Sequence, residues 1–127
     1  MESDSASLDW RHVASGLRAI HARMQAAAQS AGRQIQQVSL LAVSKTFPPD
    51  AIRAAAACGQ RDFGENYVQE GLAKMAELAG LPLEWHLIGP LQSNKTREVA
   101  EHFDWVQSVD REKIARYGVS IRDVQDV

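Results

Sequence analysis

A lysine ends an apolar stretch of the sequence. The segment SLLAVSKTFPPD, residues 39 to 50, runs through four apolar residues and reaches Lys45 between Ser44 and Thr46. An unperturbed lysine has a pKa near 10.4, so only about 0.04% of its amine is neutral at pH 7, but desolvation above apolar side chains such as Leu41 and Val43 lowers that pKa. A neutral amine can attack a carbonyl carbon and form a Schiff base. The segment therefore favours either a Schiff-base lysine or a solvated lysine that merely ends a strand.

Polar residues near the ends of other expected strands are candidate walls of a pocket beside this lysine. Asn66, in GENYVQE, has an amide that can hydrogen-bond a ring substituent or cap its own loop. Gly64 has no side chain to block a planar ring. His86, in EWHLIGP, either faces a bound ring or satisfies a hydrogen bond in the core. We interpret Glu65 as an outward charge at a strand end rather than as an acid inside the pocket.

Several other residues that could carry chemistry are expected to have structural roles instead. Trp85 and Trp105 lie in expected strands, and we interpret them as core or helix-packing residues rather than as a stacking surface. The run QSNKTRE places Lys95 and Arg97 near a helix start that could attract phosphate, but a capping serine and a solvated basic turn explain it as well. The single cysteine, Cys58, and four dispersed histidines predict neither an intrachain disulfide nor a metal site.

The periodicity of apolar residues switches repeatedly between that of a helix and that of a strand. Helices are expected over residues 8–31, 48–58, 67–78, 93–103 and 111–117, and strands over residues 38–44, 61–66, 83–88 and 104–109. Four strand-then-helix units in a row predict a parallel α/β sheet, open or closed. Chemistry gathers at the carboxyl ends of the strands in such sheets, and Lys45 lies at such an end.

Composition limits the classes of partner. The chain has 127 residues, of which 45% are hydrophobic and 24% charged, as expected for one globular domain. A net charge of -2 gives no broad electrostatic case for nucleic acid or an anionic membrane. The polar, acidic first ten residues are unlike a secretory signal, and no run approaches the roughly 20 apolar residues of a membrane span. We therefore expect a cytoplasmic protein whose partners are small molecules or proteins.

Four segments carry a resemblance to a known family. LLAVSKT, QRDFGENYVQEG, LEWHLIGPLQSNK and HFDWVQSVDREKIA occur in this order between about Leu8 and Ala115. Together they resemble the pyridoxal phosphate homeostasis proteins, single-domain relatives of the barrel domain of bacterial alanine racemase. The resemblance implies a (β/α) TIM-type barrel, here its first four β/α units preceded by an N-terminal helix.

The resemblance also implies a cofactor. In the family, the lysine of the VSK motif, here Lys45, holds pyridoxal 5'-phosphate as a Schiff base. Asn66 and His86, chosen above from their places near strand ends, are the further candidate cofactor-binding residues. The implied function is vitamin B6 cofactor homeostasis without catalytic turnover, and apoenzymes that need pyridoxal phosphate are the expected recipients.

The chain is short for a closed barrel, which usually takes about 250 residues. After DREKIA it reads RYGVSIRDVQDV, so we expect a single truncated barrel domain over residues 1–127 with a non-family tail over 116–127. The family holds the cofactor phosphate near its late strands, and no Gly-rich phosphate loop replaces them here. Exposed strand edges also favour self-association.

Two other functions are also compatible with the sequence. One is a pyridoxal phosphate-dependent racemase or decarboxylase, which needs a second acid or base opposite the ring, and the sequence offers no obvious candidate for it. The other is an inactive half-barrel fragment or interaction module, which binds no aldehyde cofactor.

Overall fold

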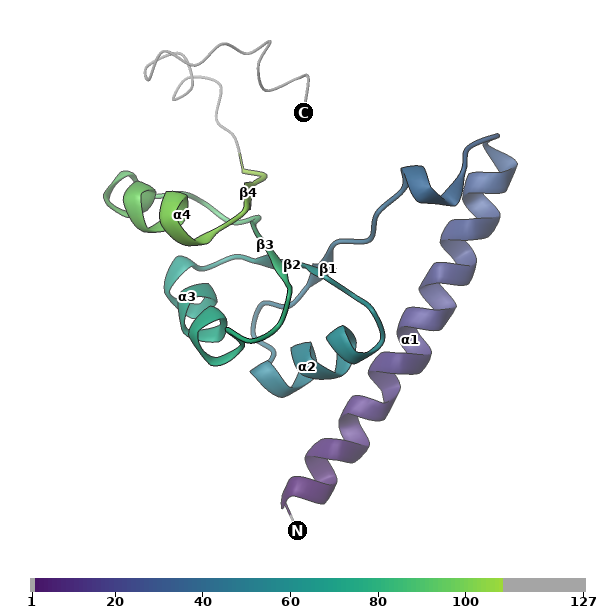
Figure 1. The fold of residues 1–127 in the computed structure, drawn as a ribbon, viewed down its shortest axis with the longest axis horizontal. Coiled ribbons are helices and arrows are strands. Elements are labelled where there is room, and N and C mark those ends of the chain that lie inside the picture. Colours follow the sequence, from purple (N-terminus) through teal and green to yellow (C-terminus); the bar gives the residue numbers. More distant parts are fainter. Residues whose placement is uncertain (1, 109–127) are drawn as a thin grey trace.

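Helices and strands alternate along the chain. The structure is a computed structural model that describes residues 2–108, with side chains from residue 12. Its elements are α1 (Glu2–Ser30), η1 (Ile35–Gln37), β1 (Ala42–Val43), α2 (Pro49–Ala57), β2 (Asp62–Glu65), α3 (Val68–Glu77), β3 (Glu84–Leu87), η2 (Ser93–Lys95), α4 (Thr96–His102) and β4 (Trp105–Val106) (Figure 1). The end of the last predicted strand, the predicted helix over 111–117 and the predicted tail over 116–127 lie outside the described residues.

The four strands form one parallel sheet in the order of the sequence, β1-β2-β3-β4. Each is followed along the chain by a helix that leads to the neighbouring strand, except β4, where the description ends. This consecutive order is that of a β/α barrel, in which every strand pairs with the next one along the chain. The predicted fold class, an α/β fold with the first four units of a barrel and an N-terminal helix, is confirmed.

Local sequence explains most boundaries. Pro49 opens α2 because its missing N–H would have no helical partner there, and Gly59 follows the helix at φ +96°. Gly32, at φ +69°, follows α1 in the same way. The predicted strand over residues 38–44 is too long, because β1 spans only Ala42–Val43. The Leu40 carbonyl accepts a hydrogen bond from the Gln60 side chain, at 2.7 Å, instead of pairing with a neighbouring strand.

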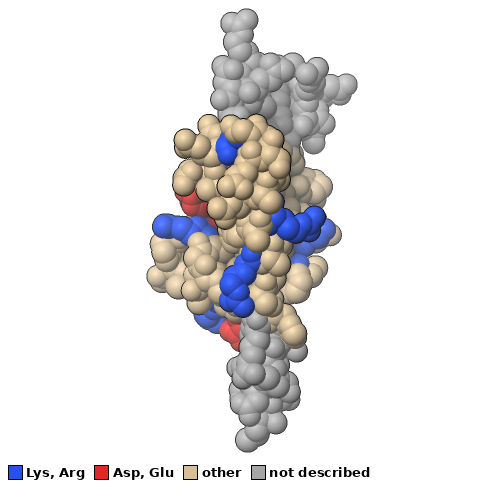
Figure 2. Space-filling model, turned by 90° about the vertical axis from the view of Figure 1, so that its right-hand side faces the viewer, with Lys and Arg blue, Asp and Glu red and all other residues tan. Residues whose placement is uncertain are grey.

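Charged side chains are spread over the face of the molecule that Figure 2 shows, where the Lys and Arg side chains form separate groups. None of the helices within residues 2–108 combines the length and apolar character that a bilayer-spanning helix needs.

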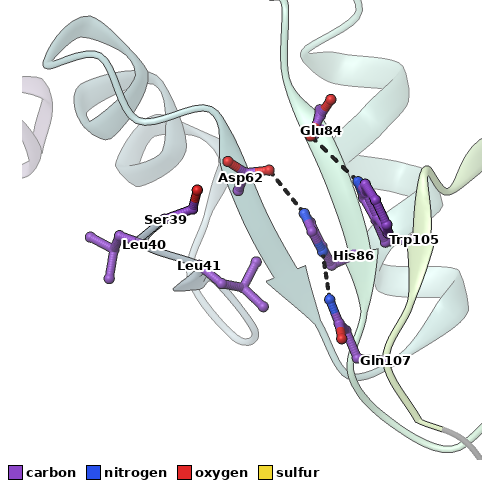
Figure 3. Close-up of a pocket in the computed structure, with 8 residues that line it drawn as sticks. All are labelled: Ser39, Leu40, Leu41, Asp62, Glu84, His86, Trp105 and Gln107. Atoms are coloured by element: carbon purple, nitrogen blue, oxygen red, sulfur yellow. Dashed lines mark hydrogen bonds and ion pairs between the residues drawn. The ribbon is translucent and has the colours of Figure 1, made fainter. Parts of the chain in front are cut away.

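One side of the sheet, here called the open face, is partly exposed. Register places Val43, Gly64, His86 and Trp105 at one level of this face. Val43 is 51% exposed and Trp105 is 44% exposed, so nothing in the described part of the chain covers them fully. Figure 3 shows His86 and Trp105 side by side on neighbouring strands. In a closed barrel this face is the interior.

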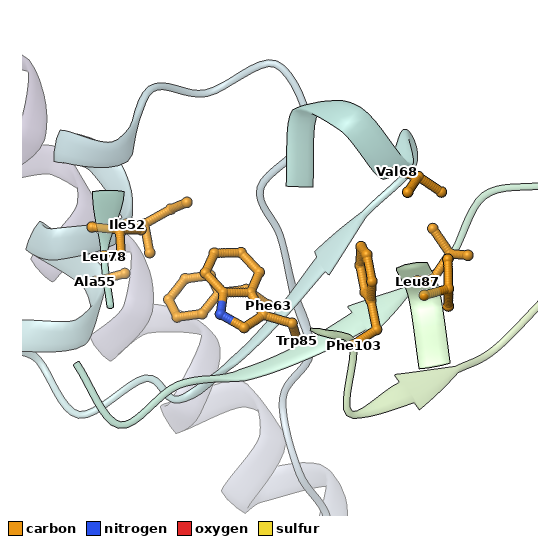
Figure 4. Close-up of a cluster of buried hydrophobic side chains, with 9 residues drawn as sticks. Ile52, Ala55, Phe63, Val68, Leu78, Trp85, Leu87 and Phe103 are labelled. Carbon is orange, nitrogen blue, oxygen red and sulfur yellow. The ribbon is translucent and has the colours of Figure 1, made fainter. Parts of the chain in front are cut away.

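The other side, here called the covered face, contains the hydrophobic core. Phe63 and Trp85 lie at one level of it, with ring centroids 6.0 Å apart, and Leu87, two residues further along β3, is fully buried (Figure 4). The helical side chains that complete the core are Ile52 and Ala55 from α2, Val68 and the nearby Leu78 from α3, and Val99 and the nearby Phe103 from α4. Trp85 is therefore a core residue, as predicted. The helices fix the strands from one side and leave the open face free for a site.

Candidate functional site

Lys45 lies at the carboxyl end of β1, as predicted. The preceding residue, Ser44, is buried, and its N–H continues the ladder by donating to the Gly64 carbonyl at 2.9 Å. Alternation along the chain therefore directs Lys45 away from the covered face. Lys45 and Val43 point to the same side of β1, as predicted, but the expected desolvation of the amine above Leu41 and Val43 is wrong for the described residues, since Lys45 and Val43 are exposed.

No hydrogen bond or ion pair within residues 12–108 involves the Lys45 amine, whereas Lys74 and Lys95 both have carboxylate partners. The backbone beside Lys45 is unusual as well. Thr46 has φ +67°, the left-handed region, which costs a non-glycine residue about 1–3 kcal/mol. Surrounding contacts must hold such a turn in place.

Those contacts come from a buried charged cluster on the covered face. Glu65 is fully buried, and its carboxylate accepts from the Ser44 hydroxyl and lies 2.9 Å from Lys74 Nζ. Lys74 Nζ also donates to the Ser44 carbonyl at 2.7 Å. The interpretation of Glu65 as an outward strand-end charge is therefore wrong, because the helix α3 brings it a buried cation.

Glu70 completes this cluster on its more exposed side. Its Oε2 lies 3.0 Å from Lys74 Nζ and accepts from the Thr46 N–H at 2.7 Å. Partial burial raises the pKa of Glu70, but hydrogen bonds from Lys74 and Thr46, and the charge of Lys74, outweigh it. The pKa of this carboxyl is therefore below its ordinary value of 4.5.

Sequence reasoning missed Lys74 altogether. It is 5% exposed and lies on the buried face of α3 with Val68 and Gly71. Gly71 lets α3 approach Phe103 and the strand β2, since a Cβ there would meet Phe103 Cζ at 2.8 Å and Glu65 Cβ at 3.5 Å. The available signal was its spacing, because Lys74 is four residues before Leu78 of the predicted apolar face and four residues after Glu70, both (i, i+4) pairs.

His86 lies on the open face, one level closer to the amino ends of the strands than Lys45. Its Nε2 is 3.0 Å from Asp62 Oδ1, its Nδ1 is 3.1 Å from Gln107 Nε2, and its ring stacks on Trp105 at 5.7 Å and 9° (Figure 3). The interpretation of Trp105 as a core or helix-packing residue is wrong, because register places it on the open face. Both ring nitrogens of His86 have protein partners, so its position agrees with the predicted alternative of a satisfied histidine.

A cavity of about 430 Å³ opens beside this histidine, and its lining residues are Ser39, Leu40, Leu41, Asp62, Glu84, His86, Trp105 and Gln107. One ligand atom each from Asp62, Glu84 and His86 lie within 4.8 Å of one another. Sequence spacing predicted no metal site and gave no sign of this grouping, which depends on the pairing of β2 with β3. The Asp62 carboxylate already contacts the imidazole.

Asn66 lies at the carboxyl edge, just after β2, and is half-buried. Gly89 approaches it so closely that a Cβ there would lie 2.1 Å from the Asn66 carbonyl oxygen. Asn66 and Lys95 line a second cavity, of about 370 Å³. Lys95 pairs with Glu98 at 3.7 Å, consistent with the predicted basic turn, but the predicted capping serine is wrong, because the N-cap residues of η2 and α4 are Gln92 and Lys95. Lys45 and Asn66 thus share one edge of the sheet, while His86 lies below that edge on the open face.

Comparison of sequences identifies relatives. Over 104 residues the chain is 62% identical to the pyridoxal phosphate homeostasis protein of Pseudomonas aeruginosa, covering 82% of this chain and 45% of that protein. The proteins of the same name from Vibrio cholerae and Escherichia coli K12 are 57% and 54% identical, covering 83% and 81% of this chain and 46% and 45% of the relatives. The chain is homologous to the pyridoxal phosphate homeostasis proteins. It spans less than half the length of these curated relatives. No protein-family model matches it.

Solved structures agree with this relationship. PipY of Synechococcus elongatus is 53% identical in its structure without PLP, with a TM-score of 0.61, covering 74% of this chain and 44% of PipY. Its structure with PLP bound gives 51% identity and a TM-score of 0.58, covering 76% and 45%. An unknown protein from Bifidobacterium adolescentis has a TM-score of 0.76 at 35% identity, covering 92% of this chain and 51% of that one.

Proposed function

We propose that the chain binds pyridoxal 5'-phosphate through Lys45 and takes part in cytoplasmic vitamin B6 cofactor homeostasis without catalytic turnover. The observation that carries the proposal is the Lys45 amine, which is exposed at the carboxyl edge of β1 and has no partner among the described residues. The names of the curated relatives and the PLP-bound structure of PipY support it.

Pyridoxal 5'-phosphate, when bound, would supply an aldehyde. A neutral lysine amine can condense with an aldehyde to a Schiff base, with loss of one water. Residues of this chain fit such a group at the open face. Gly64 leaves the level between Val43 and His86 without a side chain, and its missing Cβ faces Ile88 at 3.0 to 3.5 Å. The Ile88 side chain occupies that space, so a flat ring would pack against Ile88 rather than directly against the Gly64 backbone.

Asn66 and His86 are the further residues that we assign to this site. The amide of Asn66 lies at the same edge as Lys45 and can hydrogen-bond a ring substituent. The imidazole of His86 is held by Asp62, Gln107 and Trp105, so its ring has a fixed orientation on the open face.

A titration with pyridoxal 5'-phosphate tests the proposal. The near-visible absorbance band of the protein-bound aldehyde should rise and saturate with the wild-type chain and be lost in Lys45→Ala. The matched control is Lys95→Ala, which removes a lysine paired with Glu98 and should keep the band. An unchanged band in Lys45→Ala would contradict the proposal, because another amine would then carry the group.

Two further measurements separate the alternatives. Incubation of the loaded chain with L-alanine should leave the optical activity constant, and its loss would favour a racemase. Transfer of the cofactor to an apoenzyme should restore that enzyme's activity, which would support a role in delivery. A folded chain that binds no aldehyde cofactor would instead favour an inactive fragment or interaction module.

A further inference from the structure

The two peptide groups that flank the Lys45 α-carbon are both held by side chains of one helix. The carbonyl before Lys45, that of Ser44, accepts from Lys74 Nζ at 2.7 Å. The N–H after Lys45, that of Thr46, donates to Glu70 Oε2 at 2.7 Å. Lys74 and Glu70 both belong to α3 and are joined by an ion pair of 3.0 Å.

We propose that Glu70 and Lys74 are positioning residues, which hold Lys45 in the direction that its reaction with an aldehyde requires. This inference rests on the proposed function, because it assigns a role to residues beneath the same lysine. Neither side chain has to touch the cofactor, since each acts through the backbone of Lys45.

The contacts beneath Lys74 make this support rigid. Its ammonium is also bound by both oxygens of Glu65, at 3.1 and 2.9 Å. The Lys74 and Glu65 side chains are only 6% and 0% exposed, so water cannot readily replace these bonds. Lys74 thus anchors the β1 end from the covered face, while Lys45 lies exposed beyond it.

The turn after Lys45 explains why such support is needed. Thr46 is β-branched and has φ +67°, a conformation that such a residue adopts only where its surroundings impose it. Two hydrogen bonds supply the constraint, because the Thr46 N–H donates to Glu70 Oε2 at 2.7 Å and the Phe47 N–H donates to the Ser44 carbonyl at 3.1 Å. Without the Glu70 carboxylate only the second bond remains, and the turn can relax and redirect the lysine side chain.

The charges of the cluster also fit this role. Glu65 and Glu70 contribute two negative charges and Lys74 one positive charge, so the support beneath Lys45 has a net charge of -1 when all three are ionised. The Glu70 carboxyl, whose pKa is lowered below 4.5 by Lys74 and the Thr46 N–H, is ionised at neutral pH. The Thr46 N–H therefore meets a charged acceptor, which makes a stronger bond than a neutral one.

Amide hydrogen exchange of the whole chain without cofactor tests the geometry first. In Glu70→Ala the Thr46 N–H should exchange about tenfold faster or more, while core amides such as that of Leu87 keep their wild-type rates. In Glu70→Gln, whose amide oxygen can still accept a hydrogen bond, the exchange rate of the Thr46 N–H should lie between the rates in the wild-type chain and in Glu70→Ala. The matched control is Glu77→Ala, at the end of the same helix, where the carboxylate pairs with Arg53 at 3.8 Å and the Thr46 rate should not change.

Titration with pyridoxal 5'-phosphate then tests the consequence. The affinity should fall about tenfold in Glu70→Ala, recover largely in Glu70→Gln and stay unchanged in Glu77→Ala. Wild-type exchange at Thr46 in Glu70→Ala would overturn the inference, and so would faster exchange with unchanged affinity. If the wild-type chain formed no adduct on Lys45, the proposed function would fail and this inference with it, whereas the exchange rates would still report whether Glu70 holds the turn.

Discussion

Replacement of Lys74 by methionine should destabilise the fold strongly. The change keeps most of the side-chain volume but removes an ammonium that lies 2.9 Å from Glu65 Oε2 and 2.7 Å from the Ser44 carbonyl. Glu65 has no exposed surface, so its carboxylate would stay buried without a counter-charge. Breaking a buried ion pair by removing one partner costs about 3–5 kcal/mol, a large part of a typical stability of about 5–15 kcal/mol.

Urea unfolding followed by circular dichroism measures this effect. With a slope of about 2 kcal/mol per M, the unfolding midpoint of Lys74→Met should fall by about 2 M. The matched control Lys95→Met breaks a more exposed pair at 3.7 Å and should cost less than about 1 kcal/mol. The double variant Glu65→Leu/Lys74→Met, which removes both charges, should be more stable than Lys74→Met. A Lys74→Met chain within about 1 kcal/mol of wild type would refute the reasoning.

Three further perturbations have defined outcomes. The pKa of Glu70 is lower in the folded chain than its unfolded value near 4.5, so ionisation of Glu70 stabilises the fold above that pH. This stabilisation is lost as the pH falls through the folded pKa. Urea unfolding measured from about pH 6 to 3 should therefore show a smaller loss of stability in Glu70→Gln than in the wild-type chain. Gly89→Ala should cost about 3 kcal/mol in the same assay, because its Cβ would collide with the Asn66 backbone, whereas Gly80→Ala, with open space around it, should stay within about 0.5 kcal/mol. Lys45→Ala should leave the unfolding midpoint unchanged, since the side chain is exposed and has no partner among residues 12–108.

The architecture followed from local signals in the sequence. Pro49 and Gly59 delimit α2 because each suits one helix end and not the interior, and the alternation of strand and helix periods gave the parallel order. Strand length was less predictable. Apolar residues before Ala42 resemble a buried strand, yet a strand extends only as far as its partner does, and the Gln60 side chain takes the Leu40 carbonyl instead.

Some residues of the candidate site could likewise be placed from the sequence, and others could not. Lys45 and Asn66 could be placed at the carboxyl edge because the ends of parallel strands share an edge. The cluster beneath them could not be placed, since a sequence gives the types of Glu65 and Lys74 but not the approach of α3 that buries them together. From the sequence alone a charged residue is predicted to face solvent, because burying a charge is strongly unfavourable unless a partner of opposite charge is buried with it. The exposed stacking position of Trp105 was likewise fixed by pairing of β3 with β4.

Reductive trapping tests the central claim most directly. The whole chain is mixed with pyridoxal 5'-phosphate, reduced with borohydride and digested, and the modified peptide is mapped by mass spectrometry beside Lys45→Ala and Lys95→Ala. The account predicts one saturable adduct on Lys45, absent in Lys45→Ala and retained in Lys95→Ala. Weak labelling spread over several lysines and unchanged in Lys45→Ala would contradict it.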